Sequence, residues 1–165
     1  MKIKLEKCPQ ELSNLSHICG IDEVGRGCLS GPVFAGAVIL PKGFESDLIK
    51  DSKKLSEKKR LKAFELITEN ALSWSYCSVD PNIIDRDNIQ QATYSAMNYA
   101  IKNLDIKPEH LLVDGNIFEN ETDIPHTCVI KGDNKYLSIA AASIVAKVIR
   151  DDYMVKIDKF YPQYN

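Results

Sequence analysis

The chain has 165 residues, 44% of them hydrophobic and 27% charged, and a formal net charge of -2, which is typical of one globular domain over residues 1–165. Its longest apolar run, VFAGAVIL, is too short to span a bilayer and its polar start contains no signal-peptide core, so we expect a cytoplasmic protein with no membrane partner. Five cysteines without a C-x-x-C pair argue against a disulfide framework, and three widely separated histidines argue against a zinc site.

The first half of the chain predicts a hairpin, a helix and a third strand. Two β-compatible runs, SHICGIDE and GPVFAGAVIL, lie within residues 16–40 on either side of a glycine-rich turn and predict the hairpin. Apolar residues at helical spacing, with Ser56 as N-cap, predict a helix over 56–72. The segment LSWSYCSV, residues 72–79, predicts the strand.

Positive charge is concentrated just before this helix. In KDSKKLSEKKRLK, residues 50–62, seven lysines and arginines stand against two acids. Such a run is usually a solvated helix face, and the acidic pI of about 5.9 does not by itself indicate a nucleic-acid-binding protein. The run therefore indicates phosphate binding only if other residues support it.

The second half alternates helices and strands. A capping box from Asp87 to Gln90 predicts that a helix begins there. HLLVDGN (110–116) and HTCVIKGD (126–133) predict strands with acidic ends, and the alanine-rich segment from Ser138 to about Tyr161 predicts a long helix. Three leading strands followed by this alternation predict an α/β domain with a mixed central sheet flanked by helices in three layers.

Four carboxylates stand at predicted strand ends: Asp22, Glu23, Asp114 and Asp133. Each Asp-Gly or Gly-Asp pair is also an ordinary turn former. If the strand ends converge, however, these carboxylates repel one another unless cations neutralise them, and an all-oxygen set favours Mg²⁺ or Mn²⁺. Such a cluster suits two-metal phosphoryl chemistry. Neighbouring residues on a regular strand point to opposite faces, so Asp22 and Glu23 share a site only if the strand is distorted or ends there.

Two further patterns suit phosphate contacts. Gly25 and Gly27 allow close backbone approach to a phosphate and Arg26 supplies a charged donor, although an ordinary hairpin turn explains the same residues. Ser143 and Lys147 recur at helical spacing with Arg150, and such a stripe is usually the solvent side of a helix. Because the stripe follows soon after Asp133, Ser143 and Lys147 are candidates for the same site.

Taken in order, GIDEVGRG followed by GPV, then DSKKLSEKKR, LLVDGN and KGDNKYLSIAAASIVAKVIRD, resemble the ribonuclease HII (type 2 ribonuclease H) family over residues 19–165. The resemblance implies a ribonuclease H-like fold and an endoribonuclease that hydrolyses the RNA strand of RNA/DNA hybrids. It also implies incision at ribonucleotides embedded in duplex DNA, with 5′-phosphate and 3′-hydroxyl products. Two Mg²⁺ or Mn²⁺ ions are expected during turnover, and we expect a monomer.

The resemblance also assigns roles to residues. The family's four catalytic and metal-binding acids match Asp22, Glu23, Asp114 and Asp133. Its glycine-arginine-glycine motif, which contacts the nucleic acid around the ribonucleotide and its 2′-OH, matches Gly25, Arg26 and Gly27. Positions expected near the substrate backbone match Lys53, Lys54, Ser143 and Lys147.

The sequence departs from the family pattern in two places. Cys28 stands where the family usually has proline, a change that removes no ligand. The chain stops at Asn165, before the family's segment with a junction-recognising tyrosine, so we expect a C-terminally short domain. This leaves open the alternative of a catalytically silent hybrid-binding remnant, whereas the motif order argues against a phosphatase or nucleotide hydrolase acting on small phosphoesters.

Overall fold

The computed structural model describes residues 5–50 and 52–164 and contains one five-stranded sheet. Its strands, in the order β3-β2-β1-β4-β5, are β1 (Ile18–Val24), β2 (Val33–Ile39), β3 (Ser73–Val79), β4 (His110–Asp114) and β5 (His126–Val129). The helices are α1 (Glu57–Asn70), α2 (Pro81–Lys102) and α3 (Leu137–Asp158), with 3-10 turns η1 (Gln10–Leu12), η2 (Ser52–Lys54), η3 (Gly132–Asn134) and η4 (Pro162–Tyr164).

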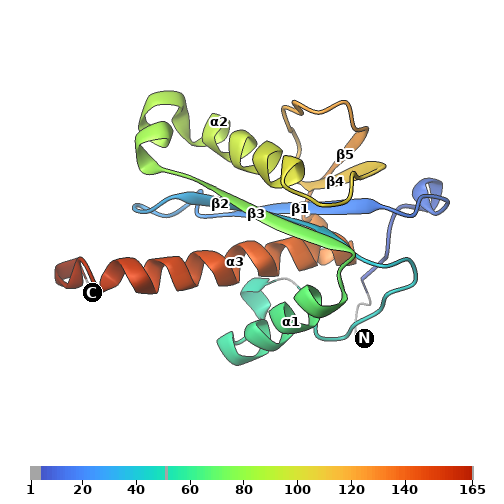
Figure 1. Ribbon diagram of the computed structural model, residues 1–165, viewed down its shortest axis with the longest axis horizontal. Helices are drawn as coiled ribbons and strands as arrows, with labels where there is room; N and C mark the ends of the chain where they lie inside the picture. The colour runs from blue at the N-terminus through green and yellow to red at the C-terminus, as the bar shows by residue number, and fades with distance from the viewer. Residues whose placement is uncertain (1–4, 51, 165) are drawn as a thin grey trace.

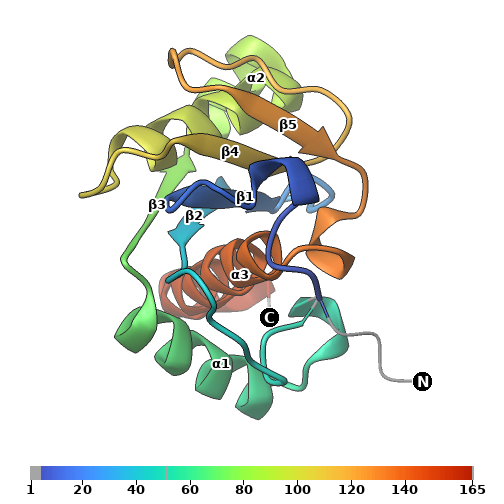
Figure 2. The ribbon, with the colours of Figure 1, turned by 90° about the vertical axis from the view of Figure 1, so that its right-hand side faces the viewer.

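The helices cover both faces of the sheet. Helix α2 packs on one face, and α3 packs on the other with α1 beside it (Figure 1). Figure 2, turned by 90°, shows the same succession of layers from α2 through the sheet to α3 and α1. The predicted three-layer domain with a mixed sheet is therefore confirmed. In the described part of the chain no helix is both long and apolar enough to cross a membrane.

Strand direction changes across the sheet. The pairs β1–β2 and β2–β3 are antiparallel, which confirms the predicted hairpin, while β1–β4 and β4–β5 are parallel. In the β1–β4 pair Ile21 stands opposite Val113, so the next residues, Asp22 and Asp114, end up side by side at the same edge. The carboxyl ends of β1, β4 and β5 therefore share one end of the sheet.

Helix α3 lies close to the sheet at two glycines. A side chain at Gly20 would place its Cβ 2.1 Å from the backbone of Ser138, and one at Gly36 would lie 2.5 Å from the Ala142 carbonyl oxygen. Because hydrogen atoms replace side chains at these strand positions, the alanine-rich first half of α3 is fully buried against β1 and β2. This close approach brings the Ser143 side chain next to the Asp22 carboxylate.

The structure corrects the predicted start of the second helix. Helix α2 begins at Pro81, and Asn88 interrupts it with φ 71° and ψ 163°. The Asn88 Oδ1 atom accepts hydrogen bonds from the backbone N–H groups of Gln90 and Gln91, at 2.9 and 3.1 Å. The predicted capping box at Asp87 is therefore wrong by one residue, because the side-chain cap comes from Asn88.

The predicted strand over residues 126–133 is also too long. Strand β5 ends at Val129, and Lys131 adopts a left-handed conformation with φ 56° before η3 begins. Asp133 consequently lies in a 3-10 turn and not at a strand end. The reversal at Lys131 folds this turn back towards the end of β4.

Candidate active site

Asp22 and Asp114 are neighbours on adjacent parallel strands. Asp22 is two residues after Gly20, which faces α3, so it points to the same side of the sheet and is 5% exposed. Asp114 is likewise two residues after Leu112, and Leu112 packs against Ile139 of α3. The register between β1 and β4 therefore brings the two carboxylates together on the α3 side.

Glu23 reaches the site from the other face of β1. Pairing with β2 is regular here, with Asp22 opposite Gly36 and Glu23 opposite Ala35, so the two acids point to opposite faces. The strand is therefore not distorted between the two acids, and Glu23 can share the site with Asp22 because it is near the end of β1. Its Oε1 atom lies 3.5 Å from Nη1 of Arg26.

Asp133 joins the cluster through η3. The backbone N–H of Gly132 donates a hydrogen bond to Oδ1 of Asp114 at 2.6 Å, which fixes the turn against the end of β4. Asn134 donates to Oδ1 of Asp133 at 2.8 Å. All four predicted acids therefore lie at one end of the sheet, three on strands and one on a turn.

The two carboxyl groups on β1 have raised pKa values, so their ionised forms are disfavoured. Burial raises the pKa of Asp22 well above its usual value; Glu23 and Asp114 raise it further, while a hydrogen bond from the Ser143 hydroxyl opposes the rise. Burial also raises the pKa of Glu23, with Arg26 opposing and Asp114 adding to the effect. Proximity of the acids thus carries an electrostatic cost that a cation would remove.

The pKa of Asp114 is raised for similar reasons. Burial is the main cause, the Gly132 amide opposes it, and the negative charge of Asp133 adds to it. The positive charge of Lys53 opposes the rise as well. Lys53 is therefore close enough to affect the carboxylate electrostatically.

The donor set fits a hard divalent cation. Asp22, Glu23 and Asp114 offer carboxylate oxygens only, in a cluster whose charges repel one another, which is the chemistry that Mg²⁺ and Mn²⁺ prefer. Within residues 5–50 and 52–164, no three histidine, cysteine, aspartate or glutamate side chains already surround one point as metal ligands. The strand register nevertheless brings Asp22 and Asp114 to the same end of the sheet.

Arg150 organises the loop that contains Gly25, Arg26 and Gly27. Its buried guanidinium donates from Nε to the Pro32 carbonyl oxygen at 3.2 Å and from Nη2 to the Ser30 carbonyl oxygen at 3.1 Å. Gly25 has φ 106°, and an added Cβ would lie 2.8 Å from Nε of Arg150. Helical spacing predicts Arg150 only as part of a polar stripe with Ser143. Spacing alone does not reveal that Arg150 is buried.

The same loop exposes its tip. Arg26 and Gly27 are both exposed, and nothing lies within 4 Å of a Cβ added at Gly27. The structure therefore brings Arg26 to the carboxylates through Glu23 and leaves the backbone at Gly27 open to a ligand.

Lys53 and Lys54 lie on η2, a turn that packs against α3. Both are exposed, and the Nζ atom of Lys54 donates to Oδ1 of Asn134, next to Asp133. The Ser52 and Ser143 hydroxyl oxygens are 3.0 Å apart in the interior. The structure thus brings both lysines to the acidic cluster, and Ser52 joins their turn to α3.

The two predicted residues on α3 differ in position. Ser143 is 6% exposed and contacts Asp22 and Ser52, so it faces the interior side of the site. Lys147, one turn later, donates to Oδ1 of Asp151 at 2.6 Å and is partly exposed. Ser143 therefore belongs to the carboxylate cluster, whereas Lys147 pairs with Asp151 on its own helix.

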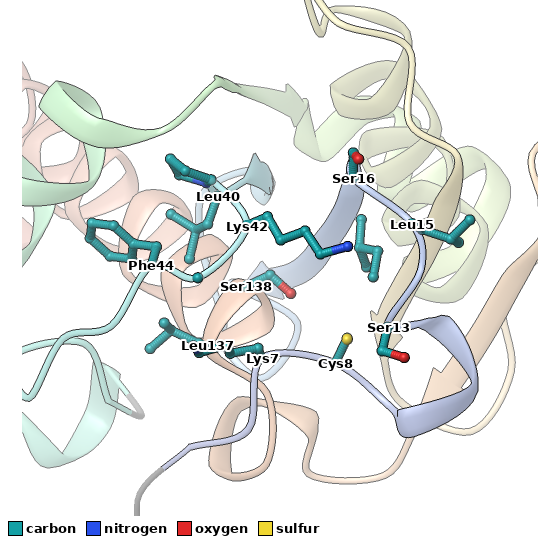
Figure 3. Close-up of a pocket in the computed structure, with 13 residues that line it drawn as sticks. Lys7, Cys8, Ser13, Leu15, Ser16, Leu40, Lys42, Phe44, Leu137 and Ser138 are labelled. Atoms are coloured by element: carbon teal, nitrogen blue, oxygen red, sulfur yellow. The ribbon is translucent and has the colours of Figure 1, made fainter.

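A separate cavity of about 350 Å³ opens at the other end of the sheet, where β1 and α3 begin (Figure 3). Apolar side chains such as Phe44 and Leu137 form much of its lining, together with Lys7 and Lys42. The Ser138 hydroxyl beside it is buried and has no hydrogen-bond partner among the described residues. The described residues that line this cavity include none of the predicted site residues.

A family model, ribonuclease HII, matches residues 19–165. The chain belongs to the ribonuclease HII family. The ribonuclease HII of Bacteroides thetaiotaomicron is 55% identical over 146 residues, which cover 88% of this chain and 73% of that protein. That of Porphyromonas gingivalis is 50% identical with the same coverage.

Solved structures agree with this assignment. The ribonuclease H2 of Pyrococcus horikoshii superposes with a TM-score of 0.80 at 26% identity, covering 90% of this chain and 79% of that one. Ribonuclease HII of Archaeoglobus fulgidus, solved in complex with PCNA, gives a TM-score of 0.74 at 29% identity, covering 88% and 78%. The predicted ribonuclease H-like fold is confirmed. The chain is an endoribonuclease of this family, which acts on RNA/DNA hybrids, and the silent-remnant alternative gains no support.

Proposed function

We propose that this member of the family incises duplex DNA at embedded ribonucleotides as well as cutting the RNA strand of hybrids, leaving 5′-phosphate and 3′-hydroxyl ends. The observation that carries the proposal is the adjacency of Asp22 and Asp114 on parallel strands, with Glu23 and Asp133 beside them. Clustered buried carboxylates are costly unless they bind cations. Their cost is explained if they bind divalent cations, which in turn hold the substrate phosphate.

We propose all four acids as the catalytic and metal-binding set, with one Mg²⁺ or Mn²⁺ ion, or two during turnover. Bound there, the ions would lower the pKa of an attacking water and stabilise the leaving oxygen. Asp22 and Asp114 hold the centre from one face of the sheet, and Glu23 reaches it from the other. The hydrogen bond from Gly132 fixes the orientation of Asp114.

Nucleic-acid binding is assigned to two segments that flank the acids. The loop with Gly25, Arg26 and Gly27 presents exposed backbone and a guanidinium on one side, where it suits the 2′-OH and phosphate of the ribonucleotide. On the other side, Lys53 and Lys54 suit the phosphates of the backbone. Ser143 orients Asp22 through its hydrogen bond, and Lys147, which pairs with Asp151 one turn further along α3, is proposed as a further phosphate contact. The cytoplasm and a monomeric state stay predictions.

The test is a cleavage assay with three labelled duplexes: DNA with one ribonucleotide, a uniform RNA/DNA hybrid, and DNA alone. Each duplex is incubated with the chain in Mg²⁺, in Mn²⁺ and in EDTA. We expect metal-dependent cleavage of the first two substrates, a 5′-phosphate on the product and an intact DNA blank.

The outcomes separate the parts of the proposal. Cleavage of the hybrid alone would contradict the embedded-ribonucleotide activity and leave the catalytic assignment standing. Cleavage that persists in EDTA would contradict the role given to the carboxylates. Salt-sensitive binding without any product would favour the silent remnant.

A further inference from the structure

Arg60 lies in the basic run, yet its side chain turns inward. Only 14% of that side chain is exposed, although the lysines of the same segment are exposed. Its Nη1 atom donates to the Ser52 carbonyl oxygen at 2.8 Å and lies 3.3 Å from the Leu55 carbonyl oxygen, which it also contacts as a donor. One guanidinium nitrogen therefore connects both ends of a single turn.

The residues between these two carbonyls are Lys53 and Lys54. The Ser52 carbonyl oxygen also accepts the N–H of Leu55 at 3.4 Å, which closes the 3-10 turn. Because η2 is only three residues long, it has few backbone bonds of its own and depends on outside contacts for its shape. Arg60 supplies such a contact at each end of the turn.

Arg60 is itself held from α3. Its Nη2 atom lies 3.7 Å from Oδ2 of Asp151, and Oδ1 of Asp151 accepts from Lys147. On the other side of the turn, Ser52 bonds to Ser143. Two contacts with α3 therefore fix η2 relative to the helix that supports Asp22.

We propose that Arg60 is a positioning residue for substrate binding: it holds Lys53 and Lys54 in the geometry in which they meet the backbone phosphates. The inference rests on the proposed function in one respect, the contact between these lysines and the substrate. Arg60 acts through the turn and does not itself touch the nucleic acid. Its guanidinium is suited to this role because it donates several hydrogen bonds in a fixed plane.

Removing the guanidinium loosens the turn, which keeps its contact with α3 through Ser52 and Ser143, and adds an entropic cost of ordering the lysines on binding. For Arg60→Gln we expect KM for the uniform hybrid to rise about tenfold, the size expected when a charged hydrogen bond is lost, with kcat within about twofold of the parent. The dependence of log KM on log salt should become shallower, because fewer phosphate contacts are formed. For Arg60→Lys most of the KM defect should remain, since an ammonium keeps the charge without the planar fork.

The matched control is Arg86→Gln, on α2 at the opposite face of the sheet. Arg86 is an exposed arginine paired with its neighbour Asp87, so the substitution removes the same charge without touching η2. We expect its KM, kcat and salt dependence to match the parent. Urea unfolding of each variant confirms that the protein assayed is folded. If Arg60→Gln does not fold, Arg60→Lys takes its place as the test variant.

A double-mutant cycle separates positioning from general stability. In a Lys53→Ala/Lys54→Ala background, Arg60→Gln should raise KM no further, because the residues it positions are gone. An unchanged KM and salt dependence in Arg60→Gln, or a KM rise that persists in full in the lysine-free background, would overturn the inference. Absence of cleavage by the parent chain would instead contradict the proposed function.

Discussion

The two faces of the sheet bury polar groups in different ways. On the α2 face such groups bond to the backbone: Ser75 donates to the Ala100 carbonyl oxygen and Asn98 to the Glu119 carbonyl oxygen at 2.8 Å. On the α3 face Arg150 also bonds to backbone, but hydroxyls bond to each other beside Asp22, as in the pair of Ser52 and Ser143. The α2 face therefore uses its polar atoms to close its own structure, whereas the α3 face also gathers hydroxyls around a carboxylate.

This difference explains where chemistry is possible. A hydroxyl bonded to a helix carbonyl satisfies an acceptor at the helix end and has no further role. A carboxylate whose pKa is raised by burial and by like charges, such as Asp22, is instead an electrostatic cost that folding alone does not require. Substitution of Asp22 should accordingly lower activity and raise stability, whereas substitutions on the α2 face should lower stability and leave activity unchanged.

Asp22→Asn should cause the largest loss of activity and, at the same time, a gain in stability. We expect cleavage of the hybrid to fall by about a thousandfold, the loss typical of removing one electrostatic group from an active site. The amide keeps the shape of the side chain without the buried charge, so the free energy of unfolding at neutral pH should increase. Retained cleavage would refute the catalytic role.

The same variant tests the sign of the pH dependence. Because the pKa of Asp22 is raised in the folded state, the folded protein binds the proton more tightly than the unfolded chain. This contribution to stability is present below pH of about 4, the unfolded pKa, and is lost as pH rises through the folded value. Urea unfolding in EDTA should therefore show the advantage of Asp22→Asn over the parent growing from pH 4 to 7.5. A constant difference would contradict the shift.

Gly25→Ala should break the support between the site loop and α3. An alanine would be strained at φ 106°, and its Cβ would lie 2.8 Å from Nε of Arg150 and 2.9 Å from the Pro32 carbonyl oxygen. We expect a loss of about 1–3 kcal/mol in unfolding free energy, together with a fall in activity.

Gly27→Ala is the matched control, since nothing lies within 4 Å of its added Cβ. It should leave the unfolding free energy within about 0.5 kcal/mol of the parent, as surface substitutions usually do. Equal destabilisation by the two substitutions, measured by urea unfolding, would show that loop position and not the contact with Arg150 decides the effect.

Ser75→Ala probes the α2 face and should have the smallest effect. It removes the hydrogen bond to the Ala100 carbonyl oxygen, so we expect a loss of about 1 kcal/mol in unfolding free energy with kcat and KM unchanged. Ser78→Ala, an exposed position on the same strand, is the control. A change in kcat for Ser75→Ala would show that the two faces are not independent.

Local patterns predicted the elements better than their ends. The hairpin, the strand after α1 and the alanine-rich helix are present, because their hydrophobic periodicity reflects one buried face. The second helix begins earlier than predicted, and Asn88, not Asp87, supplies the side-chain cap. Asn88 is able to cap because its own backbone leaves the helical conformation, a feature that the sequence pattern does not show.

The candidate site was predicted by residue type and motif order, but its geometry was not. Arg60 and Arg150 show what the sequence pattern does not predict. Each arginine lies among other polar residues in the sequence, yet its side chain turns inward and donates to backbone carbonyl oxygens. Helical spacing describes which residues share a face, and it does not say whether that face meets solvent or another segment.

The sequence by itself determined the family and the succession of helices and strands, and it predicted the four acids, because these depend on local pattern and ordered motifs. Only the tertiary structure decided that Asp22 and Asp114 are side by side, since this follows from a strand register between residues far apart in the chain. It also decided that Glu23 reaches the site from the opposite face and that Asp133 arrives on a turn. Interactions between distant segments depend on how whole layers pack, and no short stretch of sequence contains that information.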